Sequence, residues 1–116
     1  MKFLVYTPPR IVSAASYTTD TGTSLDISAC DIFIVTAQAG ALLFNNPSGT
    51  PVQWQKLTIR IKDNWTARAL TYGSQFRASS DLALPTTTVL SKTLYMWFVY
   101  NSTDTKRDLL AVLNNF

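Results

Sequence analysis

The chain has 116 residues, the size of a single domain with one hydrophobic core. Hydrophobic residues make up 47% and charged residues only 15%, a balance typical of globular rather than disordered proteins. All seven acidic residues are Asp, and the sequence contains neither Glu nor His. The absence of His excludes Ser-His-Asp and Cys-His catalysis and His-ligated zinc. Many Thr and Ser residues, together with the absence of Glu, favour β-structure.

The net charge of +3 is small, and the basic residues are not clustered beyond the pair Lys106-Arg107. We therefore expect no nucleic-acid partner. The apolar run Phe3–Tyr6 ends at Pro8-Pro9, which makes it too short for a signal peptide or a spanning helix, so no membrane partner is expected. Cys30 is the only cysteine and adjoins an apolar run, which predicts a buried, unpaired thiol.

The N-terminal third is predicted to contain an arm and three strands. Met1–Arg10 combines a short apolar run with two prolines and is predicted to be an extended arm. Ile11–Thr19 is predicted to be an edge strand. Asp31–Ala37 and Ala41–Phe44 are apolar and rich in β-prone residues, which predicts two further strands. The turn formers of Asn45–Pro51 separate these strands from the next element.

The middle of the chain predicts a β-hairpin. Apolar and polar residues alternate over Gln53–Lys62, Asp63-Asn64 supplies turn residues, and Trp65–Tyr72 is predicted to be the returning strand. We expect the Asp63 carboxylate to bond to the backbone in this turn. Trp65 directly follows polar turn residues and is the tryptophan most expected to be exposed.

The C-terminal part predicts a second hairpin. Lys92–Asn101 is apolar on both faces, which is typical of a strand covered on both sides or lying in an oligomer interface. The polar loop Ser102–Arg107 connects it to the predicted strand Asp108–Leu113. Shorter strands are predicted at Gln75–Ala78 and Thr86–Leu90.

These elements together predict an all-β fold. No window carries apolar residues at helical spacing over three turns, and short strands at regular spacing are typical of sandwiches. We expect a single antiparallel β-sandwich, jelly-roll-like, over residues 11–116, preceded by the arm Met1–Arg10. No repeat and no heptad pattern is present, so neither a solenoid nor a coiled-coil stalk is expected.

The sequence offers no convincing reaction centre. Asp26 and Asp31 lack a third oxygen-rich position at fixed spacing, so we expect no metal site. The four glycines are scattered and form no phosphate loop, and no cofactor is expected. An enzyme is not indicated. The aromatic residues are interpreted either as a stacking platform for sugars or bases or, preferably, as core and interface packing. They are Trp54, Trp65, Trp97, Tyr72, Tyr95 and Tyr100.

The chain from Ile34 onwards resembles a domain of tailed-bacteriophage virion structural proteins. Three segments carry the resemblance, and they cover about two-thirds of the chain: VTAQAGALLFNNPSGTP (Val35–Pro51), the run QKLTIRIKDNWTARALTYGSQFRASSDLALPTTT (Gln55–Thr88), and KTLYMWFVYNSTDTKRDLLAV (Lys92–Val112). Trp65 departs from the family, which often has Gly after the Asp-Asn turn. The resemblance implies an all-β virion structural protein without catalysis.

Two functions are therefore considered first. The preferred hypothesis is a non-enzymatic capsid decoration (cement) protein on the outer surface of a phage particle. It would form a homotrimer and dock on the major capsid protein or another virion component. The alternative is a receptor- or glycan-binding module of a tail fibre or tail spike. A third hypothesis, a basic OB-like nucleic-acid binder, is less favoured.

The preferred hypothesis assigns two sets of contact residues. The two-sided apolar strand near the C-terminus predicts a face that needs a second cover. Its proposed oligomer-interface residues are Tyr95, Trp97 and Val99. Contacts to another virion component are expected from the arm and from the exposed hairpin tip. The residues are Phe3, Leu4, Val5, Tyr6 and Trp65.

Overall fold

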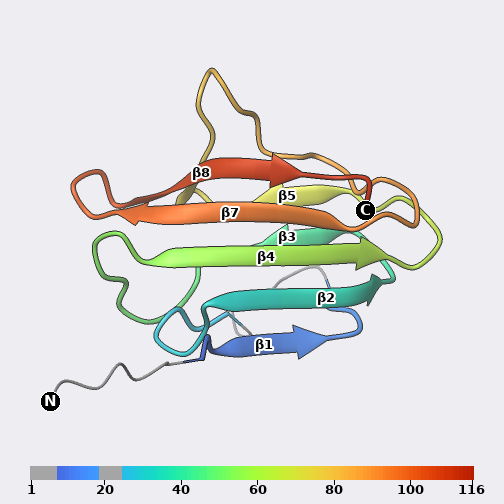
Figure 1. Ribbon diagram of the computed structural model, residues 1–116, viewed down its shortest axis with the longest axis horizontal. Coiled ribbons are helices and arrows are strands. Elements are labelled where there is room, and N and C mark those ends of the chain that lie inside the picture. The colour runs from blue at the N-terminus through green and yellow to red at the C-terminus, as the bar shows by residue number, and fades with distance from the viewer. Residues whose placement is uncertain (1–7, 19–24) are drawn as a thin grey trace, which may run out of the picture.

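Strands and connecting loops, without any helix, make up residues 8–18 and 25–116, the part of the chain that the computed structural model describes (Figure 1). The expected all-β class is confirmed. The strands are β1 (Ile11–Ala14), β2 (Ile32–Gln38), β3 (Leu42–Phe44), β4 (Lys56–Asp63), β5 (Leu70–Tyr72), β6 (Phe76–Arg77), β7 (Leu94–Asn101) and β8 (Lys106–Leu113).

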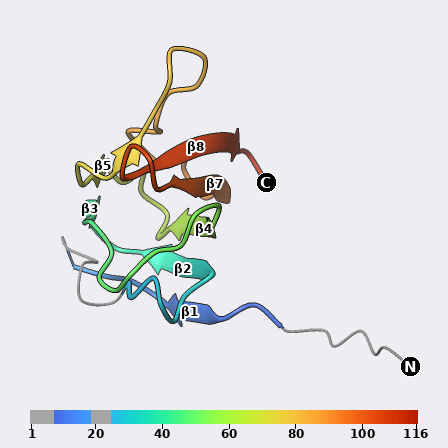
Figure 2. The same ribbon diagram turned by 90° about the vertical axis from the view of Figure 1, so that its left-hand side faces the viewer.

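The strands form one large sheet and one small sheet. The large sheet has six strands in the order β1-β2-β4-β7-β8-β6, and the small sheet pairs β3 with β5. Figures 1 and 2 show that the small sheet lies on one face of the large one. We call this side of the large sheet the inner face and the opposite side the outer face.

The expectation of a purely antiparallel fold is wrong, because the large sheet is mixed. β4 and β8 run antiparallel to β7, whereas β1 with β2, β2 with β4, and β6 with β8 are parallel pairs. The small sheet is also parallel. Parallel neighbours need a crossover connection rather than a tight turn. Between β2 and β4 that crossover contains β3, which lies in the other sheet.

The predicted hairpin in the middle of the chain is wrong as well. β2 and β7 occupy the two edges of β4, so no edge is left for a returning strand. The chain leaves the large sheet after Asp63, and the predicted return strand contributes only β5, which pairs with β3. Alternation of apolar residues predicted both strands but not their partners, because it carries no information about non-local pairing.

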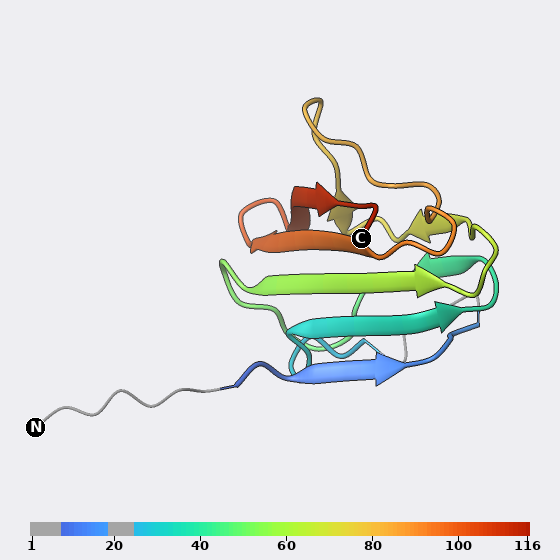
Figure 3. The same cartoon turned by 45° about the vertical axis from the view of Figure 1, so that its right-hand side comes forward.

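The Asp63 side chain fixes the connection between β6 and β7 instead of a hairpin turn. Its buried carboxylate accepts hydrogen bonds from the Thr88 hydroxyl at 2.8 Å and from the Ser91 backbone N–H at 3.0 Å. The expected backbone bond is therefore present, but in the connection between β6 and β7. The predicted strand Thr86–Leu90 is reduced to a single bridge between Thr87 and Ala69. Figure 3 shows the earlier part of this connection projecting beyond the edge of the sheet.

The second predicted hairpin is confirmed as β7 and β8. The register pairs Asn101 with Lys106 next to the loop and Tyr95 with Leu113 at the far end. The register shifts between Trp97 and Phe98, which places a bulge in β8.

The edge strand β1 is fixed to the sheet near both of its ends. Before the strand, Arg10 Nη2 forms an ion pair with Asp31 Oδ1 at 2.8 Å. After it, the Tyr17 N–H donates to the buried Gln38 Oε1 at 3.0 Å, and Gln38 Nε2 donates to the Tyr17 carbonyl at 2.8 Å. Arg10, the last residue of the predicted arm, therefore contacts the domain.

One apolar core lies between the two sheets. A chain of aromatic contacts crosses it from β2 through the small sheet and back to β7. The ring centroids lie 6.4 Å apart for Phe33 and Phe44, 5.4 Å for Phe44 and Tyr72, 6.0 Å for Tyr72 and Phe76, and 5.1 Å for Phe76 and Phe98. Such contacts add to the free energy of burial because tilted rings pack favourably.

Candidate functional site

The outer face of the large sheet exposes apolar side chains. Alternation along β7 buries Leu94, Met96 and Phe98 on the inner face and turns Tyr95 and Trp97 outward. Trp97 is 45% exposed, although it lies on a central strand. A side chain of this size on a central strand is normally covered, so this face is the first candidate site of the molecule.

The strands beside β7 extend this apolar area. Trp97 pairs with Thr58 on β4 and with Ala111 on β8, and Tyr95 pairs with Leu113. A shallow hollow of about 280 Å³ lies among these side chains. Its lining residues are Thr58, Tyr95, Met96, Trp97, Ala111 and Leu113.

Two further side chains border this hollow. The Phe116 ring stands edge-on to Tyr95, with centroids 5.4 Å apart, and is itself exposed. The Lys56 ammonium lies 5.6 Å from the centre of the Trp97 ring, within the range of a cation–π contact. The outer face therefore combines an aromatic centre with a basic border.

Val99 differs from the other two predicted interface residues. It lies on the same face of β7 as Tyr95 and Trp97, but it is only 7% exposed. Its side chain lines a different hollow, next to Trp54. The structure thus brings Tyr95 and Trp97 into one accessible area and separates Val99 from it. The predicted contact residues Phe3, Leu4, Val5 and Tyr6 lie outside the described residues.

Trp65 and Trp54 flank the two ends of β4. The expected exposure of Trp65 is confirmed, since it is 80% exposed at a left-handed backbone position with φ of 60°. Trp54 is 70% exposed with φ of 68°. Trp54 was not predicted to be exposed, because the alternation from Gln53 onwards placed it inside a strand. The signal that could have found it is its closeness to the turn formers ending at Pro51.

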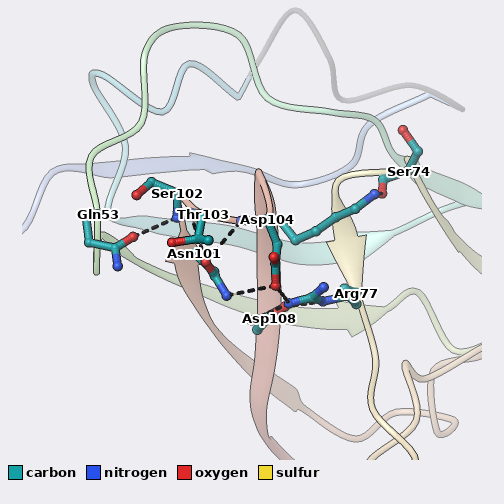
Figure 4. Close-up of polar contacts among 9 residues, drawn as sticks. Gln53, Ser74, Arg77, Asn101, Ser102, Thr103, Asp104 and Asp108 are labelled. Atoms are coloured by element: carbon teal, nitrogen blue, oxygen red, sulfur yellow. Dashed lines mark hydrogen bonds and ion pairs between the residues drawn. The ribbon is translucent and has the colours of Figure 1, made fainter.

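An ion-pair cluster fixes the β7–β8 loop to β6 (Figure 4). Arg77 donates from Nε to Asp108 Oδ1 at 2.6 Å and from Nη2 to Asp108 Oδ2 at 3.0 Å and Asp104 Oδ2 at 3.0 Å. These bonds raise the pKa of Arg77, with Asp108 as the larger cause, and lower the pKa of Asp108. Lys106 Nζ donates to the Ser74 carbonyl at 2.7 Å. Two contacts from residues 74–77 therefore hold the loop and the start of β8 in place.

A second hollow, which we call the Trp54 hollow, lies beside this cluster and has a volume of about 370 Å³. Hydrogen bonds hold its walls in place. Gln53 Oε1 accepts from the Ser102 N–H at 2.6 Å, and Asn101 Oδ1 accepts from the Thr103 N–H at 3.0 Å (Figure 4). The lining residues are Gln53, Trp54, Val99, Tyr100, Asn101, Thr103, Asp104 and Asp108.

One cation lies within the core. Arg107 is 2% exposed, and its guanidinium lies 5.3 Å from the centre of the Tyr100 ring. Nη1 donates to Gln75 Oε1, whereas Nη2 has no hydrogen-bond partner in the described part of the chain. Burial lowers the pKa of Arg107 because a charged group is costly inside the protein.

The remaining candidate groups are the cysteine and the acidic side chains. Cys30 is buried in the core as expected, and burial raises the pKa of its thiol. Within residues 8–18 and 25–116, no three His, Cys, Asp or Glu side chains are grouped so that they could hold a metal ion. The same residues contain no helix long and apolar enough to cross a membrane.

Comparisons of the chain with protein-family models, with curated proteins and with solved structures give no match. The resemblance to phage virion proteins therefore rests on the sequence segments quoted above.

Proposed function

We propose that this chain is a non-enzymatic structural protein of a bacteriophage particle and that it assembles with copies of itself through the outer face of the large sheet. The observation that carries this proposal is Trp97, a large aromatic side chain exposed on a central strand. Tyr95 and Leu113 surround it with further apolar surface.

The composition of the outer face supports an interface. Aromatic residues are enriched at the centres of protein interfaces, and polar residues at their rims. Here Tyr95 and Trp97 form the centre, while Arg60 and Lys56 lie beside them on β4. A second copy that covers Trp97 would remove apolar surface from water, which stabilises an assembly by about 25 cal/mol per Å².

The assembly we propose is a homotrimer that decorates the outer surface of the capsid as a cement protein. The support is the resemblance to virion structural proteins together with the expected arm Met1–Arg10, whose apolar residues suit docking on the major capsid protein or another particle component. Many weak contacts on a regular lattice would then add up to firm attachment.

The proposal includes a finer description of the fold. Because both sheets contribute to one core, we describe them as the two layers of a β-sandwich. The arrangement is jelly-roll-like only in having two packed layers, since its parallel pairs differ from the antiparallel jelly roll.

Controlled disassembly of the particle that carries the chain tests its location. We expect the chain to remain with capsid shells, and a variant lacking residues 2–9 to fold and assemble but to leave the shells. Recovery of the wild-type chain with isolated tails alone would contradict capsid decoration. Undiminished capsid binding of the shortened variant would contradict a docking role for the arm.

A specific observation also favours the second function, a receptor- or glycan-binding module of a tail fibre or tail spike. Trp54 and Trp65 are the two most exposed tryptophans and flank the two ends of β4. Exposed tryptophan rings are typical contacts for the apolar faces of sugars. Binding of the chain to a glycan array tests this function independently of assembly.

A further inference from the structure

Trp54 combines an unfavourable backbone conformation with an exposed apolar side chain. Its φ of 68° lies in the left-handed region, which is unfavourable for a residue with a Cβ. Its large side chain is 70% exposed to water. The conformation is held by a hydrogen bond from the Trp54 N–H to the Tyr100 carbonyl at 3.0 Å. Strained residues that the surroundings hold in place are characteristic of ligand sites.

The Trp54 hollow is lined by polar side chains as well as by this tryptophan. Gln53, Thr103 and Asp104 line it, and each keeps a polar atom free. Within the described ranges, no partner is found for the Gln53 Nε2, the Thr103 hydroxyl or the Asp104 Oδ1. The other polar atoms of Gln53 and Asp104 are fixed by the hydrogen bonds drawn in Figure 4. The free groups are therefore preorganised to bind, which lowers the entropic cost of binding a ligand.

Two carboxylates line the hollow, and basic side chains lie next to them. Asp104 and Asp108 carry two negative charges, while Arg77 and Lys106 carry two positive ones. Arg77 already bonds to both carboxylates, so their charge is compensated and draws neither a cationic nor an anionic ligand strongly. The hollow is thus suited to an uncharged ligand.

We propose that the Trp54 hollow binds a neutral pyranose unit of a glycan. The apolar face of the sugar ring would pack on the Trp54 indole, while its hydroxyl groups would bond to Gln53, Thr103 and Asp104. The volume of about 370 Å³ lies at the lower end of the range of small-molecule sites, which is about 300–1,000 Å³. This inference rests on the second of the two functions proposed above and does not depend on capsid decoration.

NMR titration of the full chain tests the site. The probes are the methyl glycosides of glucose, galactose, mannose and N-acetylglucosamine, each added up to about 50 mM, because a single sugar ring binds in the millimolar range. The chain has three tryptophans, so the indole N–H region contains three signals. We expect at least one glycoside to shift the Trp54 signal and the backbone signals of Asn101–Asp104 in a saturable manner.

Two matched variants locate the binding. Trp54→Gly and Trp65→Gly each remove an exposed tryptophan from a left-handed position that glycine adopts readily. We expect Trp54→Gly to weaken the binding seen at Asn101–Asp104 by about tenfold or more, and Trp65→Gly to leave it unchanged. Asp104→Ala should weaken binding without removing the indole.

The possible failures are distinguishable. Binding that survives Trp54→Gly and is lost in Trp65→Gly would overturn the site but leave the glycan function standing. No shift of any indole signal with all four glycosides would overturn both. Binding of N-acetylneuraminic acid or choline in place of the neutral glycosides would overturn the assignment of an uncharged ligand.

Discussion

The two faces of β7 carry side chains of the same kind in different surroundings. Met96 and Phe98 face the small sheet and are fully buried, whereas Tyr95 and Trp97 face away from it and are partly exposed. Both faces belong to one central strand, bonded to β4 and β8. The face toward the small sheet is covered by that sheet, whereas within residues 8–18 and 25–116 no second sheet covers the other face, which leaves Trp97 45% exposed.

This difference separates two roles of apolar side chains. Those on the inner face stabilise the fold of a single chain, because folding removes them from water. The exposed part of the outer face, around Trp97, adds less to the stability of a single chain, because folding leaves it in contact with water. Substitutions on the two faces should therefore affect different measurements, stability for one and assembly for the other.

The largest effect is expected from Phe98→Ala. Phe98 is fully buried and packs against Phe76, with ring centroids 5.1 Å apart, so its removal leaves a cavity in the core. The free energy of unfolding should fall by about 3–5 kcal/mol, measured by urea denaturation. The matched change on the outer face is Trp97→Ala. It should lower the free energy of unfolding by about 1 kcal/mol or less at protein concentrations where the chain is monomeric. Equal losses would contradict the division between the two faces.

A smaller effect of opposite sign is expected from Arg107→Met. Arg107 is the buried cation beside Tyr100, and its Nη2 lacks a hydrogen-bond partner in the described residues. Because Met fills similar space without a charge, the free energy of unfolding should rise by about 1 kcal/mol. A clear fall would show that the contacts with Tyr100 and Gln75 outweigh the cost of burying the charge.

The smallest effect is expected at the border of the outer face, where Asp108 pairs with Val99 across the strands. Hydrogen bonds from Arg77 lower the pKa of Asp108 below its ordinary value of 3.8. In acid the native chain therefore binds fewer protons at Asp108 than the unfolded chain does. The Asp108 carboxylate stabilises the fold above its unfolded pKa. This contribution is lost as the pH falls through its folded pKa. Chemical denaturation between about pH 5 and pH 2 should show a shallower loss of stability for Asp108→Asn than for the wild type. An identical pH dependence of the two proteins would contradict the stabilising role of the contact between Arg77 and Asp108.

Local features of the fold could be predicted from the sequence, and long-range ones could not. The hairpin of β7 and β8 was predictable because its strands are joined by a short polar loop. The pairing of β4 with β2 was not, since no local pattern encodes a parallel partner across a crossover. The mixed direction of the large sheet follows from that pairing.

The same limit applies to the candidate sites. The outward-facing position of Trp97 was predictable because Lys92–Asn101 is apolar on both faces. The burial of Val99 was not, since it depends on the tertiary position of Trp54 and the segment before β4. The Trp54 hollow joins segments that are about 50 residues apart in sequence, such as Gln53 and Ser102, and only the folded chain brings them together.

The mass of the chain in solution tests the central claim most directly. Sedimentation equilibrium at micromolar concentration should give about three times the chain mass of 12.9 kDa for the wild type. The Trp97→Asp variant should give a single folded chain, because a charge at the centre of the outer face prevents its burial. A wild-type protein that stays monomeric, or a Trp97→Asp variant that still forms trimers, would contradict assembly through the outer face.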